Sequence, residues 1–331
     1  MKHGAGIYKV AKKLACKPKE IIDFSSNINL FTANTNTTIT KEMLARYGDN
    51  SYKHLKKIVA KKLSLKKSQI ALYNGATSAI FELMRELKER DVYLYAPLYG
   101  EYEKAALHVE KKVHKINRFK ALHVEPKKNS IVVFVNPSTP DAKHYNLHKL
   151  FEIWQRKNCT VILDESFLEF ENLQSFRKRI RSYKKLYIIQ SFTKFYSCAG
   201  VRIGAIFSNS NNIKKLQVPL WNLSSFDVEF LTNRLKDKEF KKQSKVLHVE
   251  QKKELKKILK KSKLFSKIYK SDANFFLVKS SRAKEIFQHL LKQKILVRTC
   301  DSFDFLGEKH LRFAVKSRKA QALLKKALTK I

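Results

Sequence analysis

The chain of 331 residues contains few glycines and prolines, 8 and 6 respectively, and only 4 cysteines. With so few backbone breakers we expect no low-complexity linker, and each glycine or proline is expected to serve a local turn. The cysteines lack CxxC or zinc-type spacing, which argues against a disulfide framework or a bound metal and indicates reduced thiols of a cytoplasmic protein. They are Cys16, Cys159, Cys198 and Cys300.

Long apolar segments are also missing from the sequence. No run of about 18 apolar residues occurs, so a membrane span is not expected. The N-terminus "MKHGAGIYKVAKKLAC" has no apolar core of the kind that secretory signals need. We therefore predict a cytoplasmic protein without a membrane partner.

Acidic residues are scarce relative to basic ones, with 29 Asp and Glu against 69 Lys and Arg and a net charge of +40. Such a charge is one mark of nucleic-acid-binding proteins. The lysines are nevertheless spread as KK and KxxK along helical faces, as in "QKKELKKILKKSKLF" (251–265), and no zinc knuckle or aromatic RNA-binding strand accompanies them. We interpret them as solvated faces whose field attracts small anions, and predict no specific nucleic-acid partner. A nucleic-acid-binding protein on an inactive enzyme fold is kept as an alternative.

Apolar, β-branched runs alternate with helical patterns through the middle of the chain. This alternation predicts an α/β fold with a mostly parallel sheet, whose ligands bind beyond the carboxyl ends of the strands. The last third predicts a long lysine-rich helix to about residue 261, followed by a smaller α+β unit. The expected strands cover residues 69–74, 91–97, 130–135, 158–164, 185–191 and 202–208.

Polar side chains with catalytic potential follow several of these strands. Asp164 and Lys194 each end a strand that should be buried, where a carboxylate and an amine are costly unless they are used. Gly75-Ala76-Thr77 lies at a strand-to-helix turn, where backbone N–H groups can bind a phosphate. A lysine able to form a Schiff base, a buried acid and a phosphate cup together describe a site for pyridoxal 5'-phosphate.

The order and spacing of these residues resemble the fold-type I pyridoxal-phosphate enzymes of the class I/II aminotransferase family. The family signature S-x-[ST]-K-x(7)-R-x-G is matched by "SFTKFYSCAGVRIG" (191–204). The resemblance implies a homodimer with an N-terminal arm (1–30), a large cofactor-binding α/β/α domain (31–225) and a small α+β domain (226–331).

The resemblance also implies a role for each matching residue. Lys194 would form the Schiff base and shuttle protons, Asp164 would keep the pyridine nitrogen protonated, and Asn136 would bond the ring's O3′. Tyr99 would stack on the ring. The cofactor phosphate would be bound by Ala76, Thr77, Ser191 and Arg202, and by Tyr47 across a dimer interface. The substrate would be bound by Arg312 through its carboxylate, by Arg298 and His3 through its phosphate, and by Asn27.

Two subgroups of the family compete, the threonine-phosphate decarboxylases of cobalamin synthesis and the histidinol-phosphate aminotransferases. The N-terminal "HGAGIYKVAKKLACKPKEIIDFSSNIN" (3–29) is similar to the decarboxylase pattern, as is Phe167 where the aminotransferases carry a tyrosine. These residues favour a lyase that decarboxylates L-threonine O-3-phosphate or L-serine phosphate through an external aldimine. A histidinol-phosphate-type aminotransferase is the alternative.

The sequence departs from the family pattern at two places. The family loop NPNNPTG is "NPSTPDA" here, with Asp141 and Ala142 in place of Thr and Gly, and we expect this to alter the rim of the site. "VPLWNLSSF" (218–226) departs from the decarboxylase pattern PWSVN, which leaves the substrate less defined than the cofactor.

Overall fold

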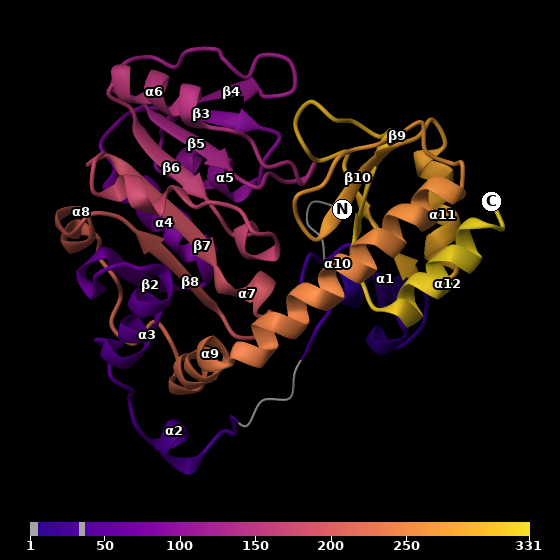
Figure 1. Ribbon diagram of the computed structural model, residues 1–331, viewed down its shortest axis with the longest axis horizontal. Helices are drawn as coiled ribbons and strands as arrows, with labels where there is room; N and C mark the ends of the chain where they lie inside the picture. The colour runs from indigo at the N-terminus through magenta and orange to yellow at the C-terminus, as the bar shows by residue number, and fades with distance from the viewer. Residues whose placement is uncertain (1–5, 33–36) are drawn as a thin grey trace.

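The computed structural model describes residues 6–32 and 37–331 of the chain. Figure 1 shows a large domain built around one sheet and a smaller domain beside it, with helix α10 (Lys238–Lys261) running diagonally from one to the other. At 24 residues, α10 spans roughly 36 Å at the usual helical rise.

The large domain contains a seven-stranded sheet in the order β2-β8-β7-β6-β5-β3-β4. Strands β3 to β7 pair in parallel, whereas β8 is antiparallel to both of its neighbours. The mostly parallel α/β sheet predicted from the sequence is therefore confirmed. The strands are β2 (Ile70–Asn74), β3 (Asp91–Ala96), β4 (Lys112–Asn117), β5 (Ile131–Val135), β6 (Thr160–Asp164), β7 (Leu186–Ser191) and β8 (Ile203–Phe207).

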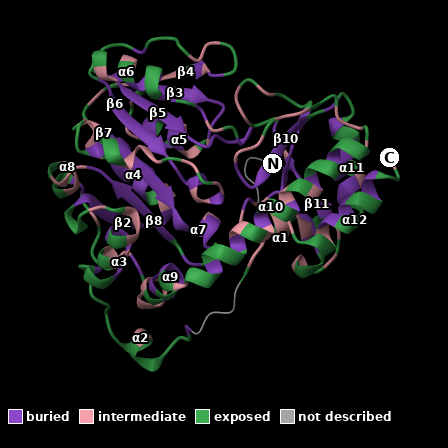
Figure 2. Cartoon of the chain, viewed as in Figure 1, coloured by how far each residue is buried: buried purple, intermediate pink, exposed green. Residues whose placement is uncertain are grey.

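Helices cover both faces of this sheet, which explains why its central strands are continuous apolar runs. All five residues of β5, "IVVFV", are buried, and Figure 2 shows the same for the neighbouring strands. One face packs against α3 and α6, and the other packs against α4 and α5. The helices are α2 (Lys41–Ala45), α3 (Lys53–Leu63), α4 (Gly75–Glu86), α5 (Glu101–His108), α6 (His148–Arg156), α7 (Phe192–Phe195), α8 (Ser210–Lys215) and α9 (Ser225–Lys236).

The small domain is built on a four-stranded antiparallel sheet in the order β12-β13-β10-β9. The described part of the predicted N-terminal arm packs on this domain, because β1 pairs in parallel with β11 and Phe24 lies in the small-domain core. These elements are α1 (Ile7–Lys13), β1 (Ile22–Asp23), β9 (Lys267–Ile268), β10 (Phe275–Lys279), α11 (Ala283–Lys292), β11 (Ile295–Leu296), β12 (Arg298–Thr299), β13 (His310–Ala314) and α12 (Arg318–Leu328). Four short 3-10 helices complete the fold: η1 (Pro18–Glu20), η2 (Lys67–Gln69), η3 (Leu168–Phe170) and η4 (Phe176–Ile180).

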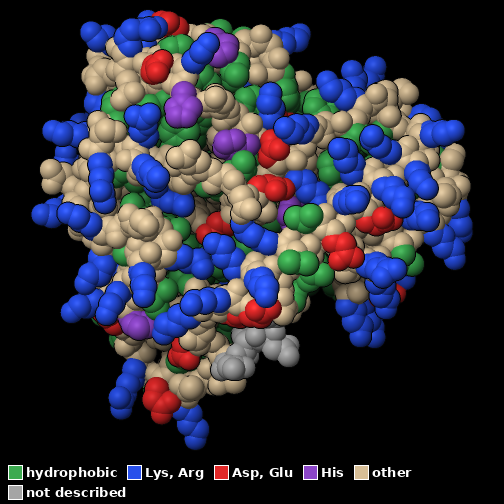
Figure 3. Space-filling view, viewed as in Figure 1, with side chains coloured by type: hydrophobic (Ala, Val, Ile, Leu, Met, Phe, Trp, Pro, Cys, Tyr) green, Lys and Arg blue, Asp and Glu red, His purple; other side chains and the backbone are tan. Residues whose placement is uncertain are grey.

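The basic residues are dispersed over the surface. Figure 3 shows Lys and Arg side chains over both domains on the visible face, without a single patch in which they gather. Within residues 6–32 and 37–331, no helix combines the length and the apolar character that crossing a bilayer requires.

Candidate active site

A cavity of about 270 Å³ lies where the two domains meet, at the carboxyl ends of the parallel strands. Both domains contribute to its walls. Ten of the residues predicted from the sequence line it: Asn27, Ala76, Thr77, Tyr99, Asp164, Ser191, Lys194, Arg202, Arg298 and Arg312.

One end of the cavity is a close-packed cradle around the first turn of α4. The helix begins at Gly75, and no described side chain caps its N-terminus. A Cβ on Gly204 would lie 2.3 Å from the backbone nitrogen of Ala76, so β8 passes this turn at a distance that only glycine permits. Gly75 has φ +76°, and a Cβ there would meet the Arg202 guanidinium at 2.8 Å. The cradle thus joins a helix N-terminus to an arginine, a combination suited to a phosphate.

The hydroxyls of the signature segment complete this cradle. Ser191 Oγ and Thr193 Oγ1 are 2.8 Å apart, and the backbone N–H of Ser191 donates to Ser166 Oγ at 2.9 Å. All three residues line the cavity. The strand end at Ser191 is therefore tied to the loop that follows Asp164.

Asp164 forms the floor of the cavity at the end of β6. One carboxylate oxygen accepts the Tyr102 hydroxyl at 2.9 Å, and the other accepts the backbone N–H of Ser166 at 2.9 Å. Burial raises the pKa of Asp164, and the hydrogen bonds and the Lys194 charge oppose that shift. A cationic group placed against this carboxylate would favour its ionised form.

Lys194 lies in the short helix α7, one turn beyond β7. Burial, the Arg312 charge and the Arg202 charge together lower the pKa of Lys194 to about 8. A large share of its amines is thus neutral and nucleophilic near physiological pH, unlike ordinary surface lysines.

The small-domain wall is cationic. Arg298 of β12 and Arg312 of β13 are direct partners in the antiparallel pairing, and both are buried. Arg312 donates to Thr139 Oγ1 at 2.9 Å and to the backbone carbonyl of Ser25 at 3.0 Å, and Arg298 donates to Ser302 Oγ at 2.8 Å. Among the described lining residues, Asp164 is the one acid against four Lys and Arg side chains. Burial lowers the pKa of Arg312 to about 10.

Two predicted residues do not line the cavity, and a third is not described. Asn136 is buried beside it, and both ends of its side-chain amide bind the backbone of Tyr145, at 2.8 and 3.0 Å. Tyr47 is 82% exposed, and its ring centroid lies 4.6 Å from that of Trp221. His3 lies outside the described residues. The roles assigned to these three residues, like those of the ten that line the cavity, stay predictions.

Two residues at the site were not predicted from the sequence. Thr139 lines the cavity and contacts Arg312, and it lies in the loop "NPSTPDA" three residues after Asn136. Tyr102 could have been found from its spacing, because it follows Tyr99 by three residues at the start of a helix. Phe167, which the sequence compares with a tyrosine, lines the cavity as an apolar residue.

The residues of the cavity fit pyridoxal 5'-phosphate. The cradle can bind its phosphate, and the neutral amine favoured by the depressed pKa of Lys194 can react with its aldehyde. The buried Asp164 carboxylate can pair with its protonated ring nitrogen. The buried side-chain oxygen of Asn27 has no hydrogen-bond partner among the described residues, which leaves an acceptor for a bound molecule.

Comparison with known proteins gives the same assignment. Residues 19–331 match the sequence profile described as "Aminotransferase class I and II". The chain is 30% identical over 342 residues to the adenosylcobalamin biosynthesis bifunctional protein CobDQ of Leptospira interrogans, covering 95% of this chain but only 39% of that longer protein.

Relatives of similar length include both predicted subgroups. The chain is 27% identical to the histidinol-phosphate aminotransferase of Flavobacterium johnsoniae, covering 93% of this chain and 89% of the relative. It is 23% identical to the threonine-phosphate decarboxylase of Salmonella typhimurium, covering 99% and 96%. The crystal structure of the histidinol-phosphate aminotransferase from Clostridium acetobutylicum matches with a TM-score of 0.79 and 28% identity, covering 93% of this chain and 98% of that one.

Proposed function

The chain belongs to the class I and II aminotransferase family of pyridoxal-phosphate-dependent enzymes, and on this premise we propose that it decarboxylates an O-phosphorylated amino acid. L-Threonine O-3-phosphate is the first candidate substrate and L-serine phosphate the second. Decarboxylation of the first releases the carboxylate as carbon dioxide, and a proton takes its place at Cα to give 1-aminopropan-2-yl phosphate.

The pair of opposed arginines carries this proposal. Like charges directly opposite each other in a sheet are unfavourable, so Arg298 and Arg312 call for bound anions. With Arg202 assigned to the cofactor phosphate, the two remaining arginines match a substrate with two anionic groups, a carboxylate and a phosphate. Histidinol phosphate carries a phosphate but no carboxylate and would leave one arginine uncompensated, whereas the 2-oxoglutarate of an aminotransferase would engage both arginines through its two carboxylates.

The cofactor would be held by the large-domain wall. The turn at Ala76 and Thr77, with Ser191, Thr193 and Arg202, would bind its phosphate, and Asp164 would pair with its ring nitrogen. Tyr99, whose hydroxyl lies 3.4 Å from Thr77 Oγ1, would cover the ring. Bound there, pyridoxal phosphate supplies an aldehyde and an electron-withdrawing ring that weakens the bonds to the substrate's Cα.

The orientation in which the chain's own residues hold the substrate would then determine which bond to Cα breaks. The bond to Cα that stands perpendicular to the ring is the weakened one, so the grip at both ends of the substrate decides the outcome. Arg312 would hold the carboxylate and Arg298 the phosphate, with His3 as its predicted helper. Lys194 Nζ would hold the proton that returns to Cα.

We also propose that the enzyme is a homodimer. Exposed apolar side chains gather near Tyr47, where Leu44, Leu220 and Trp221 are 78%, 67% and 45% exposed. An exposed apolar group of this kind is typical of an interaction surface. Tyr47 lies within it, as its predicted contact with the partner's cofactor phosphate requires.

Product analysis tests the proposed reaction. The loaded enzyme is incubated with O-phospho-L-threonine, O-phospho-L-serine or histidinol phosphate, each with and without 2-oxoglutarate, and unphosphorylated L-threonine serves as the matched control. Carbon dioxide release from a phosphorylated amino acid without 2-oxoglutarate is expected. Glutamate formation from histidinol phosphate and 2-oxoglutarate, without carbon dioxide, would establish the aminotransferase alternative, which the 27% identical Flavobacterium relative favours.

A further inference from the structure

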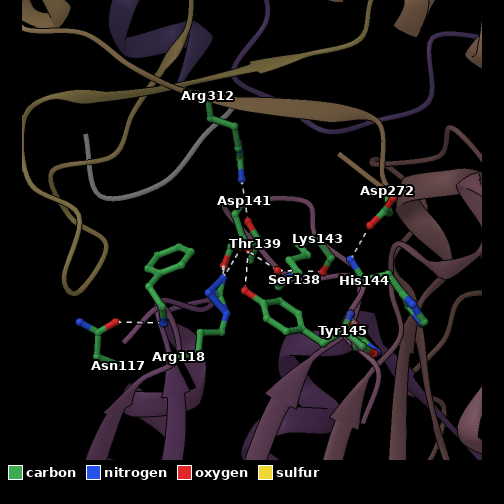
Figure 4. A network of polar contacts seen from close by, with 12 residues as sticks. Asn117, Arg118, Ser138, Thr139, Asp141, Lys143, His144, Tyr145, Asp272 and Arg312 are labelled. Carbon is green, nitrogen blue, oxygen red and sulfur yellow. Dashed lines mark hydrogen bonds and ion pairs between the residues drawn. The ribbon is translucent and has the colours of Figure 1, made fainter. Parts of the chain in front are cut away.

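The loop between β5 and α6, residues 136–145, connects the two domains beside the cavity. The Arg312 guanidinium in the small domain donates to Thr139 Oγ1 at 2.9 Å. Asp272, just before β10, donates its backbone N–H to the carbonyl of Ala142 at 2.7 Å and accepts the N–H of His144 at 2.9 Å. Figure 4 shows this loop between the sheet ends and Arg312. The position of the loop therefore bears on where Arg312 is held.

A buried ion pair holds the loop from inside. Arg118, directly after β4, forms a short ion pair with Asp141, and their side chains are 1% and 3% exposed. The Asp141 carboxylate also accepts the hydroxyls of Ser138 at 2.6 Å and Tyr145 at 3.1 Å. Arg118 reaches further and donates to the backbone carbonyl of Thr139 at 3.2 Å. The same guanidinium thus binds both the loop's acid and the residue that contacts Arg312 (Figure 4).

A buried ion pair gains little net stability, because the cost of desolvating both charges offsets their attraction. Its clearer effect is geometric, since it fixes which way the two oxygens of Thr139 point. The carbonyl faces Arg118, and the hydroxyl faces Arg312. Arg312 has no carboxylate partner among the described residues, and its Nε has no hydrogen-bond partner there. Its orientation therefore depends on the neutral acceptors Thr139 and Ser25 and on the Phe275 ring, whose centroid lies 5.0 Å from the guanidinium carbon.

We infer that Arg118 and Asp141 are positioning residues, which fix Thr139 and thereby aim Arg312 at the substrate carboxylate. The inference rests on the proposed function in one respect, the role of Arg312 as the carboxylate-binding residue. It also explains why the loop "NPSTPDA" carries an acid at Asp141, because that acid pairs with a buried arginine.

The test compares the Kd values of two probes by rapid mixing with the cofactor-loaded protein, so that binding is read before the proposed reaction consumes the first probe. O-Phospho-L-threonine carries a carboxylate, and O-phosphoethanolamine has the amine and phosphate without it. Asp141→Asn, and Arg118→Met with Asp141→Asn, should each raise the Kd for the first probe about tenfold or more and change the second less than twofold. The double variant leaves no unpaired buried charge, which keeps the test usable if Asp141→Asn alone does not fold.

Thr139→Val removes the hydroxyl that accepts from Arg312 while leaving the ion pair in place. If the pair acts through Thr139, adding Asp141→Asn to Thr139→Val should change the Kd less than twofold further. Glu171→Gln is the matched control, because it breaks an ion pair with Lys252 of α10 that does not line the cavity. It should alter the thermal midpoint without altering the ratio of the two Kd values.

Two results overturn the inference: the same fold-change in Kd for both probes, or no change in either Kd despite a lower thermal midpoint. The failure of the proposed function looks different. A wild-type enzyme that does not act on O-phosphothreonine but transfers the amino group of histidinol phosphate to 2-oxoglutarate overturns that function. The inference is then judged on L-glutamate, which carries a carboxylate, against O-phosphoethanolamine.

Discussion

The two walls of the cavity are built by different means. The large-domain wall consists of strand ends and a helix start, with Asp164, Lys194 and the Gly75 turn held by backbone contacts within one sheet. The small-domain wall consists of two arginines on paired antiparallel strands, oriented by hydroxyl and carbonyl groups of other segments. The first construction is expected of a site for a retained cofactor, and the second is expected of a site for a substrate that binds and leaves in each turnover. Changes in the large-domain wall should therefore affect cofactor retention, and changes in the small-domain wall should affect mainly substrate affinity.

The largest effect is expected from Lys194→Ala. The amine is the group that reacts with the cofactor aldehyde, so its removal should abolish both the visible absorption of the loaded enzyme and detectable turnover. Lys184→Ala is the matched control, because Lys184 is exposed just before the same strand, β7. Absorption spectra and carbon dioxide release measure both variants. Turnover that survives in Lys194→Ala would contradict the assignment of the nucleophile.

A smaller effect is expected from Arg298→Met, on the other wall. Truncating one partner of a buried charge pair costs about 2–5 kcal/mol, so KM for O-phosphothreonine should rise about a hundredfold. The cofactor should be retained, because Arg298 lies on the small-domain wall. Arg282→Met removes an exposed arginine that pairs with Glu285 and should change neither quantity. An equal loss of activity toward unphosphorylated amino acids would show that Arg298 does not bind the phosphate.

The contrast between the walls also explains what the sequence could predict. Asp164 and Lys194 could be found because each follows its own buried strand, and strand order brings such ends to one edge. Arg298 and Arg312 were identified only through a family resemblance, since their opposition depends on the register of β12 and β13. Thr139 was missed because its contact with Arg312 joins residues 173 positions apart. The lysine-rich α10 was predicted because its pattern is local.

Tyr102→Phe tests how the large-domain wall binds the cofactor at a position other than the Lys194 nucleophile. The hydroxyl stabilises the ionised form of Asp164, so its loss should raise the pKa of that carboxyl further. A protonated Asp164 cannot pair with a protonated ring nitrogen, so the Kd for the cofactor should rise about tenfold, as for one lost charge-assisted hydrogen bond. Tyr95→Phe is the control, a buried tyrosine that accepts from Trp154 instead. Equilibrium dialysis measures the Kd for the cofactor in both variants. An unchanged Kd in Tyr102→Phe would show that Tyr102 does not support cofactor binding.

The smallest expected effect is a shift in the pH dependence of cofactor capture. Capture needs the neutral amine of Lys194, so its rate in the apoprotein should rise with pH through about 8, the depressed pKa of that group. Arg312 is, after burial, the largest cause of the depression, whereas Arg298 is not among its causes. Removing a nearby cation makes protonation of the lysine easier, so Arg312→Met should move the midpoint to higher pH.

Arg298→Met should leave that midpoint unchanged, although it removes the same charge from the same wall. Stopped-flow absorption after mixing apoprotein with pyridoxal phosphate gives the rate of cofactor capture at each pH. Protein that is loaded with cofactor first and then moved to each pH shows whether the folded protein survives there. A midpoint that stays near 8 in both variants would mean that burial and the remaining cations, Arg202 first among them, depress the pKa of Lys194 without Arg312. A shift confined to Arg312→Met would show that the two walls, built by different means, are coupled electrostatically through one arginine.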